Sequence, residues 1–247
     1  MLGVVVALPW ELKTLTRQTL QAGTCSPITD NMTVALSGIG PQRAAAAAAL
    51  LLSRGVTALL SWGSAAALDD GCRPGSVVLP EWVVGRTGER HRVTSEWHRE
   101  VCNRLSAQYS VRTDALVESH ELVKNRAEKR RLALSTRAFV TDMESAAQAR
   151  FAREHRLPFL VVRAVLDSAS IQLPENVIET LDPNGKIRVR SFLAHVAIRP
   201  AEWPTFVKLG MQFRAARTTL QQTSTAVLEA SQAYLTAISP GTIASRG

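Results

Sequence analysis

The chain of 247 residues has few cysteines, few aromatic residues and no long apolar run. Its cysteines, Cys25, Cys72 and Cys102, are odd in number and widely spaced, which argues against a disulfide framework and a zinc site. No window is long and apolar enough to span a bilayer. The apolar start at residues 2–8 lacks a basic leader and indicates a first strand, not a signal peptide. We therefore expect reduced thiols, no metal and a cytoplasmic protein.

Acidic residues are also scarce, so the net charge is +8 and the sequence pI is about 10.1. From residue 186 to residue 217 there are seven basic residues and one acidic residue, a net charge of +6. They are Lys186, Arg188, Arg190, Arg199, Lys208, Arg214 and Arg217, against Glu202. This stretch would attract an anionic membrane surface, although an ordinary solvated basic surface is an equal interpretation. Nucleic-acid binding is disfavoured because no recognition module is present.

Apolar segments alternate with helical patterns along the chain, which predicts an α/β fold with a largely parallel sheet. Strands are expected at 2–8, 31–37, 57–62, 76–84, 111–117, 138–141 and 158–166, and a small-residue loop at 63–67. Helices are expected at 9–21, 41–53, 95–108, 124–134, 142–156, 190–198 and 203–237. We predict one catalytic domain over 1–190, a helical extension over 191–237 and a disordered tail over 238–247.

The last helix carries an apolar stripe with basic residues around it. Its apolar positions, spaced as on one side of a helix, include Trp203, Phe206, Val207 and Phe213. One interpretation is that the stripe packs on the domain or on a second subunit. The other is a basic amphipathic helix that lies on a membrane or lines a lipid entry.

Polar residues gather where the expected strands end, which is where α/β proteins bind ligands. They are Glu11, the turn Gly38–Gly40, Ser64, the pair Met143–Glu144 at a helix start, and Asp167. Two acids at one rim suit the cleavage of a glycosidic bond. One can bind sugar hydroxyls while the other transfers a proton.

Each of these features also has a purely structural interpretation. Glu11 can complement a helix dipole, and the glycine pair can be a simple tight turn. Asp142 and Ser145 can cap a helix, with Glu144 as a solvated neighbour. Arg163 can be the partner in a buried ion pair.

Three segments together resemble the nucleoside phosphorylase superfamily: residues 37–40, 142–147 and 158–167. This superfamily includes purine nucleoside phosphorylases and methylthioadenosine/S-adenosylhomocysteine nucleosidases, and the resemblance covers about residues 2–170. Within this superfamily the chain looks most like hopanoid-associated phosphorylases, which are thought to act on adenosylhopane. The features that carry this likeness are residues 140–145, the shortened middle part of the chain and the tail from residue 198. The resemblance implies a single phosphorylase-like domain with a mixed, largely parallel central sheet flanked by helices, a C-terminal helical extension, and a homo-oligomer.

The resemblance also implies roles for individual residues. Asp167 would hydrogen-bond or protonate the leaving purine at N7, a contribution of about 10²–10⁴-fold for a positioned acid. Glu144 would hold the ribose hydroxyls, with Met143 along the sugar. Ser64 and the turn Gly38–Gly40 would hold the nucleophile, since main-chain N–H groups there can bind an anion.

The sequence departs from the family pattern in three places. Ser61 stands where many phosphorylases have a phosphate-binding arginine, and Arg43 near the same turn is the candidate to compensate. Glu11 matches the water-activating glutamate of the nucleosidases, which a phosphorylase does not need. The purine-stacking phenylalanine is replaced by Leu122, next to Val123.

We therefore predict cleavage of the N-glycosidic bond of a 5′-substituted adenosine, such as adenosylhopane, by phosphate as co-substrate, which releases adenine and a ribose 1-phosphate derivative. No other cofactor is expected. The alternatives are hydrolysis by a methylthioadenosine/S-adenosylhomocysteine nucleosidase and a non-catalytic nucleoside- or lipid-binding relative. If the C-terminal helix binds lipid, the protein would lie at the inner membrane face.

Overall fold

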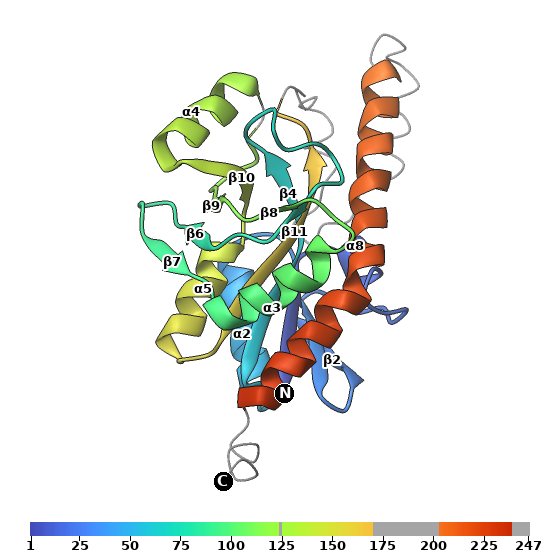
Figure 1. Ribbon diagram of the computed structural model, residues 1–247, viewed down its shortest axis with the longest axis vertical. Coiled ribbons are helices and arrows are strands. Elements are labelled where there is room, and N and C mark those ends of the chain that lie inside the picture. Colours follow the sequence, from blue (N-terminus) through green and yellow to red (C-terminus); the bar gives the residue numbers. More distant parts are fainter. Residues whose placement is uncertain (124, 170–202, 239–247) are drawn as a thin grey trace.

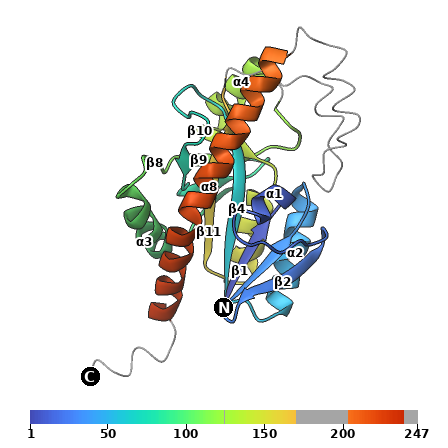
Figure 2. The same cartoon turned by 90° about the vertical axis from the view of Figure 1, so that its right-hand side faces the viewer.

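The computed structural model describes residues 1–123, 125–169 and 203–238, and confirms the predicted α/β class. A single mixed sheet has helices on both faces (Figures 1 and 2). The expected domain boundary near residue 190, the short helix at 190–198 and the tail after residue 238 lie outside the described residues.

In the part of the chain that the structure describes, the sheet contains eleven strands, and β4 lies at its centre. The main path runs β2-β3-β1-β4-β10-β9-β6-β7, while β11 pairs with both β4 and β5, and β5 pairs with β8. The strands are β1 (Leu2–Val6), β2 (Thr24–Thr29), β3 (Met32–Leu36), β4 (Ala58–Ala67), β5 (Val77–Val78), β6 (Trp82–Val84), β7 (Arg90–Arg92), β8 (Val111–Arg112), β9 (Ala115–Glu118), β10 (Ala138–Asp142) and β11 (Phe159–Asp167).

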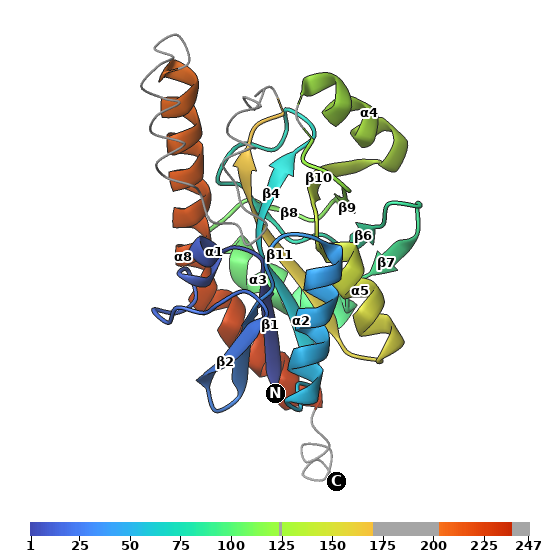
Figure 3. The same cartoon turned by 180° about the vertical axis from the view of Figure 1, so that it is seen from behind.

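The helices form two layers on opposite faces of the sheet. They are α1 (Pro9–Leu12), α2 (Pro41–Ser53), α3 (Ser95–Ser106), α4 (Arg126–Thr136), α5 (Ser145–Glu154) and α8 (Trp203–Ile238). Helix α2 packs beside α5 on one face (Figure 3), and α3 packs on α8 on the other (Figure 1). Because both faces are covered, every residue of β1 and β3 is buried, which explains their continuous apolar runs.

The predicted helix over 9–21 is wrong beyond its first turn, because α1 ends at Leu12. The hydroxyl of Thr14 donates to the carbonyl of Glu11 at 2.6 Å and accepts from the indole of Trp62 at 2.9 Å. Trp62 comes from β4, so a contact between segments far apart in sequence ends this helix. A local pattern carries no sign of such a contact.

The predicted loop over 63–67 is also wrong, since these residues continue β4. The strand pairs in parallel with β11 from Leu59 opposite Phe159 to Ala66 opposite Asp167. Small residues suggested a loop, but here they fit between neighbouring strands in a buried sheet. The predicted strand over 76–84 is in turn split into β5 and β6 around Pro80, which lacks the N–H that a ladder needs. Strands β2 and β7 were not predicted.

Helix α8 is amphipathic and packs on the domain along one side. Its buried residues include Ala216, Leu220, Val227 and Ala230. Nearer its start, Val207 is 61% exposed and Met211 is 63% exposed. Within the described ranges, no helix combines the length and apolarity needed to cross a membrane.

Candidate active site

Polar residues from five segments meet at one edge of the sheet, because β1, β3, β4 and β11 run parallel. The segments are α1 with Glu11, the turn Ser37–Gly40 before α2, Gly63–Ser64 within β4, Met143–Glu144 between β10 and α5, and Asp167 at the end of β11. The predicted residues Glu11, Ser64 and Glu144 line one small cavity. Asp167 is held by a different partner.

Glu11 is buried and its carboxylate accepts four hydrogen bonds. One oxygen accepts from the main-chain N–H groups of Ala7 and Leu8 at 3.2 and 3.0 Å, which fixes the start of α1. The other accepts from both the N–H and the hydroxyl of Ser64, each at 2.8 Å. A Cβ atom at Gly63 would lie 2.7 Å from this oxygen, so only glycine lets the carboxylate approach the strand.

Glu144 stands at the N-terminus of α5 and is only 8% exposed, so its interpretation as a solvated neighbour is wrong. Its carboxylate accepts a hydrogen bond from the N–H of Gly40 at 2.8 Å. Gly40 has φ of 107°, a conformation that favours glycine. Burial, with the negative charges of Asp142 and Glu11, raises the pKa of Glu144 to about 8. Burial also raises the pKa of Glu11.

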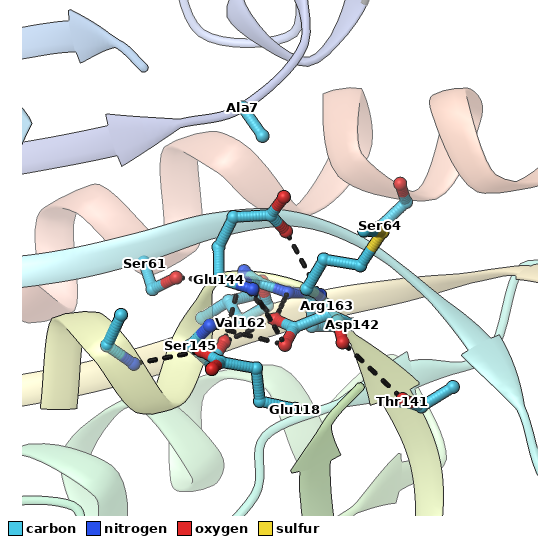
Figure 4. Close-up of polar contacts among 12 residues, drawn as sticks. Ala7, Ser61, Ser64, Glu118, Thr141, Asp142, Glu144, Ser145, Val162 and Arg163 are labelled. Carbon is cyan, nitrogen blue, oxygen red and sulfur yellow. Dashed lines mark hydrogen bonds and ion pairs between the residues drawn. The ribbon is translucent and has the colours of Figure 1, made fainter. Parts of the chain in front are cut away.

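A buried ion pair supports Glu144 from below (Figure 4). The Nη2 atom of Arg163 donates to Asp142, Ser61 and Ser145 at 2.7 Å each. The other oxygen of Asp142 accepts from the N–H groups of Glu144 and Ser145 at 3.3 and 3.2 Å. The interpretation of Arg163 as an ion-pair partner is therefore confirmed, and Asp142 binds the N–H groups at the start of α5 as a capping side chain does. The interpretation of Ser145 as a cap is wrong, because Ser145 is the first residue of the helix. Ser61, the position of the missing arginine, binds the guanidinium of Arg163.

Both carboxylates face a cavity of about 10 Å³, roughly the space that one water molecule needs. Its lining consists of Val5, Ala7, Glu11, Trp62, Gly63, Ser64, Glu144, Gln148 and Arg163. The side-chain oxygen of Gln148 is buried and has no hydrogen-bond partner in the described part of the chain. The cavity thus offers acceptors and donors to a small polar molecule.

Asp167 is buried at the end of β11 and forms an ion pair with Lys129 of α4. The ammonium group also donates to the carbonyl of Ser168 at 2.9 Å. Burial raises the pKa of Asp167, and the positive charge and hydrogen bond of Lys129 act in the opposite direction. The carboxyl is therefore held in place by a charged partner.

Sequence reasoning missed Lys129, Glu118 and Gln148. Glu118 ends β9, accepts from the N–H of Ala147 at 2.9 Å, and has a pKa that burial raises to about 7. Its position after an apolar strand was a signal that could have found it. Lys129 stands among several charged residues of a helix, so its pattern resembles a solvated face.

The other predicted residues lie around this edge. Met143 is half-buried beside Glu144, and Arg43 is exposed in the first turn of α2. Gly38 has φ of 81°, again a conformation that favours glycine. Leu122 and Val123 are half-buried between β9 and α4 and border residue 124, which lies outside the described part. Their predicted role at the base stays a prediction.

Comparison with known proteins gives one family and one fold. Residues 2–197 match the family model of the phosphorylase superfamily. No curated protein matches the chain.

Among solved structures, the fold is similar to the 5′-methylthioadenosine/S-adenosylhomocysteine nucleosidase from Helicobacter pylori, with a TM-score of 0.67 at 14% identity. It is also similar to the futalosine hydrolase of Helicobacter pylori, with 0.67 at 15%, and to the nucleosidase of Neisseria meningitidis, with 0.65 at 19%. Each match covers 94% of this chain and 97% of the other. At these identities the likeness shows the fold.

Proposed function

This chain belongs to the phosphorylase superfamily, and from its site we propose that it cleaves the N-glycosidic bond of a 5′-substituted adenosine with water as the acceptor. It is an enzyme of the nucleoside phosphorylase or nucleosidase kind. The phosphate acceptor expected from the sequence is the alternative that the experiment below must separate from water.

One observation carries the choice of water: the protein's own carboxylates occupy the main-chain donors expected to hold phosphate. The N–H and hydroxyl of Ser64 both donate to Glu11, and the N–H of Gly40 donates to Glu144. A phosphate dianion would have to displace these acids and lie beside them. The charge of Arg163 does not compensate, because it is paired with Asp142.

In the proposed reaction, an oxygen of water attacks the anomeric carbon as the bond from that carbon to the purine nitrogen breaks. Glu11 takes the proton of the water, because its carboxylate lines the cavity where the water would lie, and burial raises the pKa of this carboxyl. Asp167 gives a proton to N7 of the departing purine, which neutralises the base. A protonated Glu144 can both donate to and accept from the ribose hydroxyls, with Met143 along the sugar.

For the 5′ substituent we propose a large apolar group, of which adenosylhopane is the example that the sequence suggests. The support is the apolar character of α8 near the site. Trp10, next to Glu11, contacts Phe213 of α8 with ring centroids 4.9 Å apart.

The test of the acceptor is release of adenine from 5′-methylthioadenosine by the purified protein, with and without phosphate. We expect equal rates and free ribose derivative as product. A strict requirement for phosphate, with a sugar 1-phosphate as product, would reject hydrolysis in favour of phosphorolysis. No release under either condition, on this or longer 5′-alkylthio analogues, would favour the non-catalytic binder.

A further inference from the structure

Lys129 is the only residue of α4 that is buried, and its side chain has no exposed surface. The helix otherwise rests on the domain through half-buried Leu132 and Ala133, which pack on a small apolar cluster. An exposed ion pair from Arg126 to Asp70 adds a second contact. The deepest anchor of this helix is therefore a charged side chain, and it reaches Asp167.

Stability alone is a poor reason for this arrangement. Removing two charges from water costs several kcal/mol per ion, and apolar residues of similar size often do as well or better. The pair lies at the rim where the purine would leave. Acids with shifted pKa values cluster at functional sites, so this position indicates a role in the reaction.

We propose that Lys129 is a positioning residue that supplies, through Asp167, the proton taken by the departing purine. This inference rests on the proposed function of the site. Among the residues that the structure describes, Lys129 is the charged group that acts on the Asp167 carboxyl. In the neighbouring strand β4, Asp167 is paired with Ala66. From α8, the neutral side chain of Gln212 donates a hydrogen bond to the hydroxyl of Ser168. No charge on those neighbours competes with the lysine.

The proton balance is simple. The pair of ammonium and carboxylate holds one transferable proton. As the glycosidic bond breaks, its electron pair moves to the purine. One proton passes from the Lys129 ammonium to the Asp167 carboxylate and from there to N7, so Asp167 ends as a carboxylate. The lysine is left as a neutral amine, and it regains a proton from water after the products leave.

The experiment compares two leaving groups. Adenine, from 5′-methylthioadenosine, needs a proton, whereas nitrophenolate, from p-nitrophenyl riboside, leaves without one. For K129M we expect kcat/KM with the adenine substrate to fall by about 10²–10⁴-fold, the usual contribution of a positioned acid. With the nitrophenyl substrate we expect a loss below about 10-fold. A purely structural role would lower both rates together, so a parallel loss, or no loss, would overturn the proposal.

Two further variants keep the result interpretable. K129R preserves the positive charge, so it protects the fold if K129M does not fold, but a guanidinium does not release its proton. We expect K129R to show the same selective loss, and full adenine release by K129R would overturn proton supply by Lys129. R130M, an exposed cation on the same helix, should match the wild type on both substrates.

The wild-type protein separates this inference from the proposed function. If it turns over both substrates, the function stands whatever the Lys129 variants do. If it turns over neither substrate, both proposals fail.

Discussion

At the scale of single residues, the acids of the site lie in surroundings that favour their protonated forms. Burial raises the pKa of Glu144 to about 8 and of Glu118 to about 7, and raises that of Glu11. Hydrogen bonds from main-chain N–H groups lower the pKa of each of these acids, but burial raises it by more. The site therefore holds a proton on Glu144, while Glu11 enters the proposed reaction as a carboxylate that accepts one.

The raised pKa of Glu144 makes stability depend on pH. Its folded pKa of about 8 lies above the ordinary 4.5, so the folded state binds the proton more tightly than the unfolded state. The stability from this group is complete below about pH 4.5 and is lost as pH rises through 8. In thermal melts we expect E144Q to gain melting temperature over the wild type between pH 5 and pH 9.

E118Q is the matched control for that series. Because the pKa of Glu118 is about 7, its gain over the wild type should be complete at a lower pH than that of E144Q. Parallel curves of melting temperature against pH for E144Q and the wild type would contradict the raised pKa of Glu144.

At the scale of elements, the contact between α3 and α8 includes a buried aromatic residue, Trp97. The indole of Trp97 donates to the hydroxyl of Ser231 at 3.0 Å and stacks on Tyr234 with ring centroids 5.5 Å apart. Trp97 is fully buried, so no solvent reaches its N–H in the folded state.

We expect S231A to lower the free energy of unfolding by about 1–3 kcal/mol, because it leaves a buried indole N–H without an acceptor. Urea denaturation followed by circular dichroism measures the change. T236A, at an exposed position of α8 five residues further on, is the control and should stay within about 0.5 kcal/mol of the wild type. An unchanged S231A midpoint would mean that the hydroxyl contributes nothing at this contact.

At the scale of the whole molecule, α8 has two different sides. Its buried residues cover β11 and α3, so the helix is part of the domain core and its deletion would expose that core. On the opposite side, Val207 and Met211 are exposed, and exposed Arg214 lies one turn beyond on the same face. Apolar side chains beside a cation are the pattern of a helix that lies at a membrane interface.

Substitution, not truncation, is therefore the way to test contact with a membrane. We expect the wild type to co-sediment with phosphatidylglycerol vesicles more than with neutral vesicles, and less as salt rises, since surface charges are screened. V207S/M211S should reduce this binding several-fold. L134A removes an apolar side chain that is 74% exposed on α4 and should bind as the wild type does. Equal sedimentation of V207S/M211S and the wild type would reject the contact.

The family, the α/β class and most strands of the central sheet could be predicted from the amino-acid sequence. Strands β1, β3 and β11 are buried on both faces, so their apolar runs are visible without a structure. Glu11 comes shortly after β1, Asp167 ends β11, and Glu144 stands at the start of the helix that follows β10. Strand ends and helix starts of this kind share one rim in α/β proteins, so these three residues could be chosen from the sequence.

The pairing of these residues, in contrast, follows from the three-dimensional fold. That Glu11 binds Ser64, that Glu144 binds Gly40 and that Lys129 binds Asp167 are contacts across 53, 104 and 38 residues of chain. Local patterns carry no information about such partners, because the same lysine in the same charged helix would be solvated if α4 were turned by half a rotation. The end of α1 and the continuation of β4 were misjudged for the same reason: contacts with distant segments outweighed local preference.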